Sequence, residues 1–65
     1  MTNNVHRLKV ARTAAGLNQF DLAKRAGCSE TVISKIETGR LTPAPDLKAK
    51  IATVLGKPAF ELFTQ

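Results

Sequence analysis

Apolar residues recur along this chain at the spacing of one face of an α-helix. The recurring positions are, in chain order, Val5, Leu8, Ala11 and Ala15; Leu22, Ala23 and Ala26; Val32 (in part), Ile33 and Ile36; and Leu47, Ile51, Val54 and Leu55. They predict helices over about residues 4–15, 19–26, 30–38 and 45–55, and Pro58 opens a last short helix. The pattern therefore predicts an all-α fold.

The stretch 19–38 predicts two helices joined by a tight turn. Gly27 stands between them, and glycine reaches the left-handed backbone conformation at least cost, so it can end the first helix sharply. The hydroxyl of Ser29 can cap the free amides of a second helix that begins at Glu30. Ala23 is small enough to let the two helices cross closely. This arrangement is a helix-turn-helix.

Length and charge indicate one small basic domain. The 65 residues allow a single domain, residues 1–65, with a small core. Ten Lys and Arg residues against five Asp and Glu give a formal charge of +5, which suits a polyanionic partner. The charge alone leaves two interpretations open, nucleic-acid binding or a basic surface that only aids solubility.

The remaining composition favours a cytoplasmic protein without a membrane segment. No stretch is long or apolar enough to cross a bilayer, and the start lacks the layout of a signal peptide. The single cysteine, Cys28, cannot form an internal disulfide, which agrees with a reducing compartment. We interpret Cys28 as a buried packing residue, with a redox-sensing thiol as the alternative.

A set of residues at fixed spacing surrounds the predicted turn. It consists of Leu17-Asn18-Gln19, Leu22-Ala23, Ala26-Gly27, Ser29, Ile33-Ser34, Ile36-Glu37 and Gly39. In this order and spacing the chain resembles the DNA-binding domain of phage repressors of the Cro and CI type, the XRE family, from about Arg7 to Phe63. The resemblance implies a compact five-helix bundle of the lambda-repressor-like type, whose second and third helices form a helix-turn-helix over about residues 19–38.

Arg12 lies on the inner side of the first apolar stripe, which is unusual for a charge that has no partner. The resemblance implies that it pairs with Glu37 at the end of the recognition helix. The pair would tie the first helix to the third and hold the arginine near a DNA phosphate. The alternative is that Arg12 and Glu37 are two independent surface charges.

Two further segments are expected to contact the DNA backbone. The free amides at the start of the second helix form a natural phosphate site, and Asn18 and Gln19 add side-chain donors there. The resemblance implies that Gln19 touches a phosphate and also steadies a residue of the recognition helix, whereas Asn18 could simply be a helix cap. It also implies backbone contacts from Arg40 and Thr42 in the loop after the third helix.

The outward face of the third helix is the expected base-reading surface. Residues from the first two turns of a helix in the major groove can reach base edges. The expected readers are Glu30, Thr31, Ser34 and Lys35. Glu30 could accept from the cytosine amino group, Thr31 could meet the thymine methyl, and Lys35 suits guanine or a phosphate. The alternative is a solvated polar face, with Glu30 favoured only by the helix dipole.

The last helix predicts a contact between two copies of the chain. Leu62 and Phe63 match positions that close the core in similar domains, whereas Phe60 stands where a polar residue is common. An exposed Phe60 beside Pro58 and Ala59 suggests a patch that is buried against a second copy.

These features together indicate a sequence-specific duplex-DNA binder that regulates transcription, as a repressor, by occupying a palindromic operator as a homodimer. Two alternatives remain: a DNA-binding antitoxin with a toxin as its partner, and a protein-interaction module that has lost DNA binding. We expect no enzyme activity, no metal and no cofactor, because no catalytic pair or ligand cluster stands out in the sequence.

Overall fold

The computed structural model describes residues 4–63, with side chains from Arg7 onward, and over this range it contains five α-helices and no strands. The helices are α1 (Asn4–Ala14), α2 (Gln19–Ala26), α3 (Glu30–Glu37), α4 (Pro45–Leu55) and α5 (Ala59–Leu62). The predicted all-α fold class and five-helix bundle are confirmed. The predicted place of Val5 in the first apolar stripe lies outside the described side chains.

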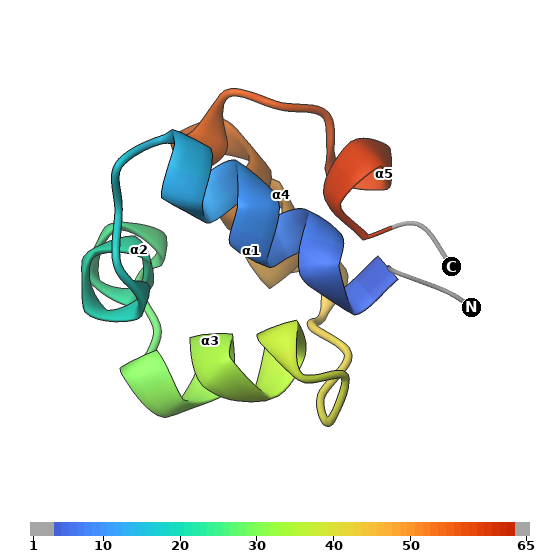
Figure 1. Cartoon of the computed structure of the whole chain (residues 1–65). Coiled ribbons are helices and arrows are strands. Elements are labelled where there is room, and N and C mark those ends of the chain that lie inside the picture. The colour runs from blue at the N-terminus through green and yellow to red at the C-terminus, as the bar shows by residue number, and fades with distance from the viewer. Residues whose placement is uncertain (1–3, 64–65) are drawn as a thin grey trace.

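The helices surround one core, with α3 along an edge of the bundle. Figure 1 shows α1 lying in front of α4, α2 and α5 on opposite sides, and α3 below. α2 packs against α3 and α4, whereas α1 packs against α3 and α5. The described chain measures 30 × 21 × 20 Å. This arrangement leaves one long side of α3 in contact with solvent.

Each helix contributes one large, fully buried side chain to the core. These side chains are Leu8, Leu22, Ile33, Ile51 and Leu62. Removing a side chain of this size from water stabilises the fold by about 1.5–3 kcal/mol. Ala23 and Ala26 of α2 are also buried, and their small size lets α2 and α3 approach closely. The core therefore fixes the position of α3 through contacts from its neighbours.

The first helix ends one residue earlier than predicted, and Ala15 is exposed rather than part of the buried stripe. The amide of Ala15 still donates to the Ala11 carbonyl at 3.0 Å, but Gly16 then takes a left-handed conformation with φ 77°. The Leu17 amide donates back to the Arg12 carbonyl at 3.1 Å. This turn directs the chain toward α2 and leaves Ala15 on its outer side.

Cys28, which was predicted to be a buried packing residue, is half-buried in the turn between α2 and α3. It packs against the edge of the core. Burial raises the pKa of the Cys28 thiol, and the nearby positive charge of Lys50 partly offsets this effect. The thiol is therefore protonated at neutral pH.

The longest helices of the described chain, α1 and α4, have 11 residues each. Pro45 occupies the first turn of α4, as predicted, where its missing amide hydrogen costs no helical hydrogen bond. A helix that spans a bilayer needs about 20 apolar residues. Within residues 4–63, no helix is long and apolar enough to cross a membrane.

Candidate nucleic-acid interface

α2 and α3 form the helix-turn-helix predicted for residues 19–38. Gly27 ends α2 in the left-handed conformation, with φ 77° and ψ 32°. A Cβ atom on Gly27 would meet no atom within 4 Å, so the backbone conformation alone requires glycine. The Ser29 hydroxyl accepts from the Val32 amide at 3.2 Å and caps α3. Both predictions about this turn are confirmed.

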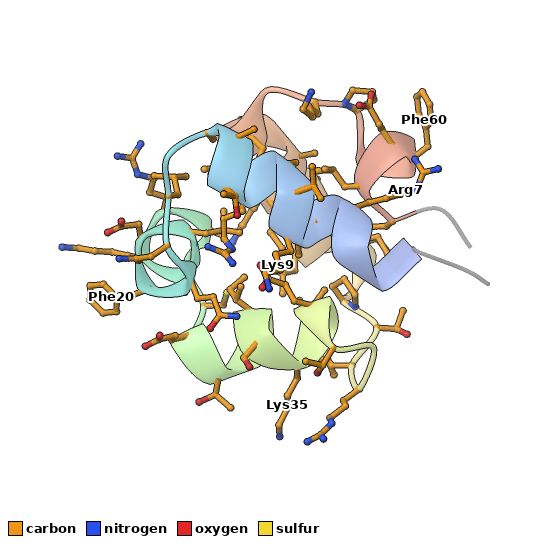
Figure 2. All side chains as sticks on the ribbon, in the orientation of Figure 1. Arg7, Lys9, Phe20, Lys35 and Phe60 are labelled. Atoms are coloured by element: carbon orange, nitrogen blue, oxygen red, sulfur yellow. The ribbon has the colours of Figure 1, made fainter. Side chains whose placement is uncertain are left out.

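α3 turns one face toward the core and the opposite face toward solvent. Ile33 and Ile36 are buried, and Val32 is half-buried. The expected base-reading residues lie on the other side. Glu30, Thr31 and Lys35 are exposed and Ser34 is half-buried. Figure 2 shows Lys35 pointing away from the other four helices. The helix therefore presents a continuous polar surface that a groove of duplex DNA can receive.

Arg12 and Glu37 form a buried ion pair between α1 and α3. Arg12 is 8% exposed and Glu37 is 6% exposed. Arg12 Nε donates to Glu37 Oε2 at 2.6 Å, and the terminal nitrogen Nη2 donates to Oε1 at 3.2 Å. Arg12 Nη1 also donates to the Leu17 carbonyl at 2.8 Å. The structure thus brings together the two residues for which the resemblance implies a pair, and it fixes the end of α3 against α1.

Gln19 joins the same network from the start of α2. Its Nε2 donates to Glu37 Oε1 at 2.9 Å. The Glu37 carboxylate therefore accepts three hydrogen bonds, two from Arg12 and one from Gln19. Since the three residues belong to α1, α2 and α3, a shift of any one helix would break at least one of these bonds. The network sets the position of α3 relative to both neighbours.

Asn18 acts as the N-cap of α2. Its Oδ1 accepts from the Asp21 amide at 2.7 Å, and its own amide donates to Asp21 Oδ2 at 3.4 Å. This reciprocal arrangement is a capping box. The Asn18 side-chain oxygen is thus already hydrogen-bonded to the helix, and the Asp21 carboxylate lies in the first turn. The amides of Gln19 and Phe20 remain the first-turn donors best placed for a phosphate.

The loop after α3 begins with a left-handed Gly39, at φ 79°. The amides of Arg40 and Leu41 both donate to the Lys35 carbonyl, at 2.8 and 3.2 Å. The Arg40 and Thr42 side chains are exposed, and Pro43 is buried beside them. The end of α3 thus fixes the loop backbone, while both expected backbone-binding side chains remain available to a ligand.

Positive charge is not concentrated on this surface. α3 and the loop after it carry two exposed cations, Lys35 and Arg40, and one exposed anion, Glu30. Arg12 is neutralised by Glu37. A polyanion at this face would therefore meet hydrogen-bond donors and helix ends as well as positive charge. Within residues 4–63, no cluster of three His, Cys, Asp or Glu side chains could hold a metal ion.

The expected dimer contact lies on α5, away from the exposed face of α3. Phe60 is 75% exposed, Pro58 is exposed and Ala59 is half-buried. Figure 2 shows Phe60 projecting outward from α5, on a different side of the molecule from Lys35. Leu62 is buried in the core, and Phe63 is half-buried against it. The exposed face of α3 and the patch of Pro58, Ala59 and Phe60 therefore lie on different sides of the molecule.

Two features of the site were not predicted from the sequence. The first is the carbonyl of Leu17, which holds Arg12; no side-chain pattern identifies a backbone acceptor of this kind. The second is the part that Asp21 plays in the capping box. The spacing Asn18-x-x-Asp21 could have indicated it, because an N-cap residue followed three positions later by a carboxylate is a known signature.

Two comparisons with known proteins agree with this geometry. A family model described as "Helix-turn-helix domain" matches residues 5–61, which include all of α2 and α3. The chain is also 38% identical over 58 residues to an uncharacterized HTH-type transcriptional regulator of Methanocaldococcus jannaschii. That alignment covers 89% of this chain and 88% of the archaeal protein.

Proposed function

This chain belongs to the helix-turn-helix domain family, and we propose its function on that basis. Membership in that family and the transcriptional-regulator name of the archaeal relative support DNA binding in the control of transcription. Beyond this, we propose that the chain recognises a specific duplex sequence through α3. The observation that carries the proposal is the exposed polar face of α3, held in place by the buried Arg12–Glu37 ion pair and the half-buried Gln19.

In this proposal α3 enters the major groove. Glu30 and Thr31 stand in its first turn, where a recognition helix contacts base edges. Glu30 accepts a hydrogen bond from a cytosine amino group, and the Thr31 methyl meets that of thymine. Ser34 and Lys35, one turn later, contact bases or phosphates. Each good base contact discriminates against a wrong base by roughly 1–3 kcal/mol.

The DNA backbone is held from both ends of α3. The first-turn amides of α2 and the Gln19 side chain bind one phosphate strand, and Arg40 and Thr42 bind beyond the other end of the helix. Three of the five N–H donors of Arg12 already bind Glu37 and Leu17. We therefore assign Arg12 mainly to positioning, with its remaining donors available to a phosphate.

Two copies of the chain bind a palindromic operator and repress transcription by occupying it. A single recognition helix contacts few base pairs, and a two-fold dimer doubles the sequence that is read. Half-sites for such dimers lie one helical turn apart, about 34–36 Å. The exposed Phe60, with Pro58 and Ala59, supports a contact between the two copies.

Replacing single lysines tests the proposed face. Lys35→Ala removes an exposed cation from α3, and Lys50→Ala removes one from α4, where Lys50 lines a shallow groove with Arg25. Since both variants lower the net charge equally, their difference reports position rather than total charge. We expect Lys35→Ala to weaken binding to a specific duplex by about tenfold or more, and Lys50→Ala to change it by less than about threefold.

Fluorescence anisotropy with a labelled duplex at near-physiological salt measures both affinities. Equal losses in the two variants would contradict a DNA-binding role for α3. Binding without any sequence preference in the wild type would favour the protein-interaction module instead.

A further inference from the structure

Large apolar side chains are exposed at four places in the part of the chain whose side chains the structure describes. They are Val10, Phe20, Leu41 and Phe60. Val10 and Phe60 belong to α1 and α5, and Val10 lines a mainly apolar groove between these helices together with Leu62. Phe20 and Leu41 instead belong to the start of α2 and to the loop after α3. These two segments hold the DNA backbone in the proposed function, so both side chains lie where a DNA strand would pass.

Phe20 is the second residue of α2 and is 55% exposed. The capping box uses the amide of Asp21, which leaves the amides of Gln19 and Phe20 as the donors for a phosphate. Figure 2 shows the Phe20 ring pointing outward from α2. Because this ring and one of the phosphate donors belong to the same residue, a strand bound by the amides runs within one side-chain length of the ring. The group that follows a phosphate along the strand is a deoxyribose.

Leu41 is 39% exposed and stands between Arg40 and Thr42, the two residues proposed to bind the backbone beyond α3. The amides of Arg40 and Leu41 donate to the Lys35 carbonyl at 2.8 and 3.2 Å, so the end of α3 fixes this part of the loop. A strand that binds the Arg40 guanidinium and the Thr42 hydroxyl therefore passes the Leu41 side chain as well.

The chemistry of a DNA strand suits this mixture of side chains. Charged phosphates alternate along it with deoxyribose rings, whose carbon atoms are apolar. The exposed face of α3 and its loop are poor in positive charge, because Glu30 offsets one of the two cations Lys35 and Arg40. An apolar side chain that packs against a sugar removes apolar surface from water, which is favourable without any charge. Exposed apolar side chains beside phosphate donors therefore suit the sugars between the phosphates.

We propose that Phe20 and Leu41 pack against deoxyribose rings of the DNA backbone while α3 occupies the major groove. The inference rests on the proposed function, and it assigns to these two side chains the sugar contacts that base reading and phosphate binding leave open. Sugar contacts carry no sequence information. They also release no counterions, so their contribution to affinity does not fall with salt as that of a phosphate contact does. Both contacts therefore add affinity that depends neither on sequence nor on salt.

Fluorescence anisotropy of the full chain over a range of salt concentrations tests the proposal. One duplex carries a single half-site selected from a random library by the wild-type chain, so contacts between copies do not contribute. A second duplex has the same bases in scrambled order. Phe20→Ala and Leu41→Ala remove the proposed sugar contacts, whereas Phe20→Leu keeps an apolar side chain. Both positions are exposed, so the variants should fold.

Val10→Ala and Arg40→Ala are the matched controls. Val10 is apolar and 65% exposed, but it lies on α1, outside both backbone-binding segments. Arg40 lies in the same loop as Leu41 but carries a charge. Val10→Ala should leave the affinity within about twofold of the wild type. Arg40→Ala should reduce the slope of log affinity against log salt concentration by about one.

We expect Phe20→Ala to weaken binding by about five- to tenfold, and Leu41→Ala by about threefold because leucine is smaller and less exposed. Each factor should be the same for both duplexes, the salt slope should match that of the wild type, and Phe20→Leu should stay within about twofold. Unchanged affinity in both alanine variants would overturn the inference and favour a protein partner for these side chains. A loss confined to the half-site duplex would also overturn it, because the residues would then act on base reading.

Isotope-filtered NOE spectroscopy locates the contacts directly. In a complex of isotopically labelled protein with the unlabelled half-site duplex, the ring protons of Phe20 and the methyl protons of Leu41 should show NOEs to deoxyribose protons. NOEs from these groups to base protons alone would contradict the assignment to the sugars.

The scrambled duplex separates this inference from the proposed function. If selection yields no preferred sequence but Phe20→Ala still weakens binding to the scrambled duplex, the proposed function fails and the sugar contact stands. If the wild type prefers the half-site and both alanine variants bind as tightly as the wild type, α3 reads DNA and the inference fails.

Discussion

Replacing Arg12 by methionine tests whether the buried ion pair holds α1 and α3 together. In Arg12→Met, Glu37 loses its contacts at 2.6 and 3.2 Å and keeps only the Gln19 hydrogen bond at 2.9 Å. Removing one partner of a buried ion pair costs about 3–5 kcal/mol, because the other charge is left without hydration or a counterion. On a scale of roughly 0.05–0.15 kcal/mol per residue, a domain of this length has a stability of about 3–10 kcal/mol. The substitution therefore removes a large part of the stability.

Urea denaturation followed by circular dichroism measures this effect. The matched variant is Arg12→Met/Glu37→Leu, which removes both charges and fills the space with apolar groups. Replacing both partners of a buried pair is often neutral, so the double variant should recover most of the loss. If Arg12→Met changes the free energy of unfolding by less than about 1 kcal/mol, the pair behaves like a solvated surface pair and our reasoning is wrong.

The double variant also separates folding from DNA binding. It keeps the fold but removes the acceptor of Gln19 and the charge of Arg12. We expect a weaker affinity for DNA, measured by fluorescence anisotropy, because α3 and Gln19 lose their fixed positions. A folded double variant with wild-type affinity would show that the network stabilises the domain without contributing to DNA binding.

Three other predictions follow from the turn, the thiol and the reading face. Gly27→Ala should lower the free energy of unfolding by about 1–2 kcal/mol in urea denaturation, because a side chain is strained at φ 77°; no loss would contradict a backbone requirement. Burial raises the pKa of Cys28 above its ordinary value of 9.0, so the stability it contributes is present below about pH 9 and is lost as the pH rises through the folded-state pKa. Iodoacetamide should accordingly modify the native thiol more slowly than the unfolded one at the same pH, and an equal or faster native rate would favour the redox-sensing alternative. Glu30→Gln should strengthen binding to random duplexes and change the preferred base at one position; an altered affinity with an unchanged preference would exclude Glu30 as a reader.

The helices were predictable because the spacing of apolar residues and the residues that start and end helices indicate the same segments. Gly27 and Ser29 mark the turn in the sequence, and the structure uses both as expected. The first helix was predicted one residue too long because alanine is a strong helix former and Ala15 falls at the spacing of the apolar stripe. The left-handed conformation of Gly16 turns the chain there, and hydrophobic periodicity does not reveal it.

The expected site residues fall into two groups. Glu30, Thr31 and Lys35 are exposed on one face of α3, which helical spacing alone suffices to predict. The burial of Arg12 depends on packing between elements far apart in the chain. Its pairing with Glu37 was implied by the family resemblance, whereas its bond to the Leu17 carbonyl has no signal in the sequence.

The groove between α1 and α5 was not predicted from the sequence. Val10 falls outside the apolar stripe of α1 and would be read as an isolated exposed residue. Only the packing of α5 against α1 brings it into the same groove as Leu62. A groove between two helices depends on how those helices pack together. The apolar pattern of each helix, taken separately, does not reveal it.

The most direct test of the central claim is selection of bound sequences from a random duplex library by the wild-type chain, at near-physiological salt that suppresses non-specific phosphate attraction. We predict enrichment of a palindrome whose half-sites lie about one helical turn apart, because two copies of α3 then enter successive major grooves on one face of the DNA. Enrichment of a single half-site would contradict the two-fold dimer while supporting base reading by α3. A selected pool with no sequence preference would contradict the claim that α3 reads DNA.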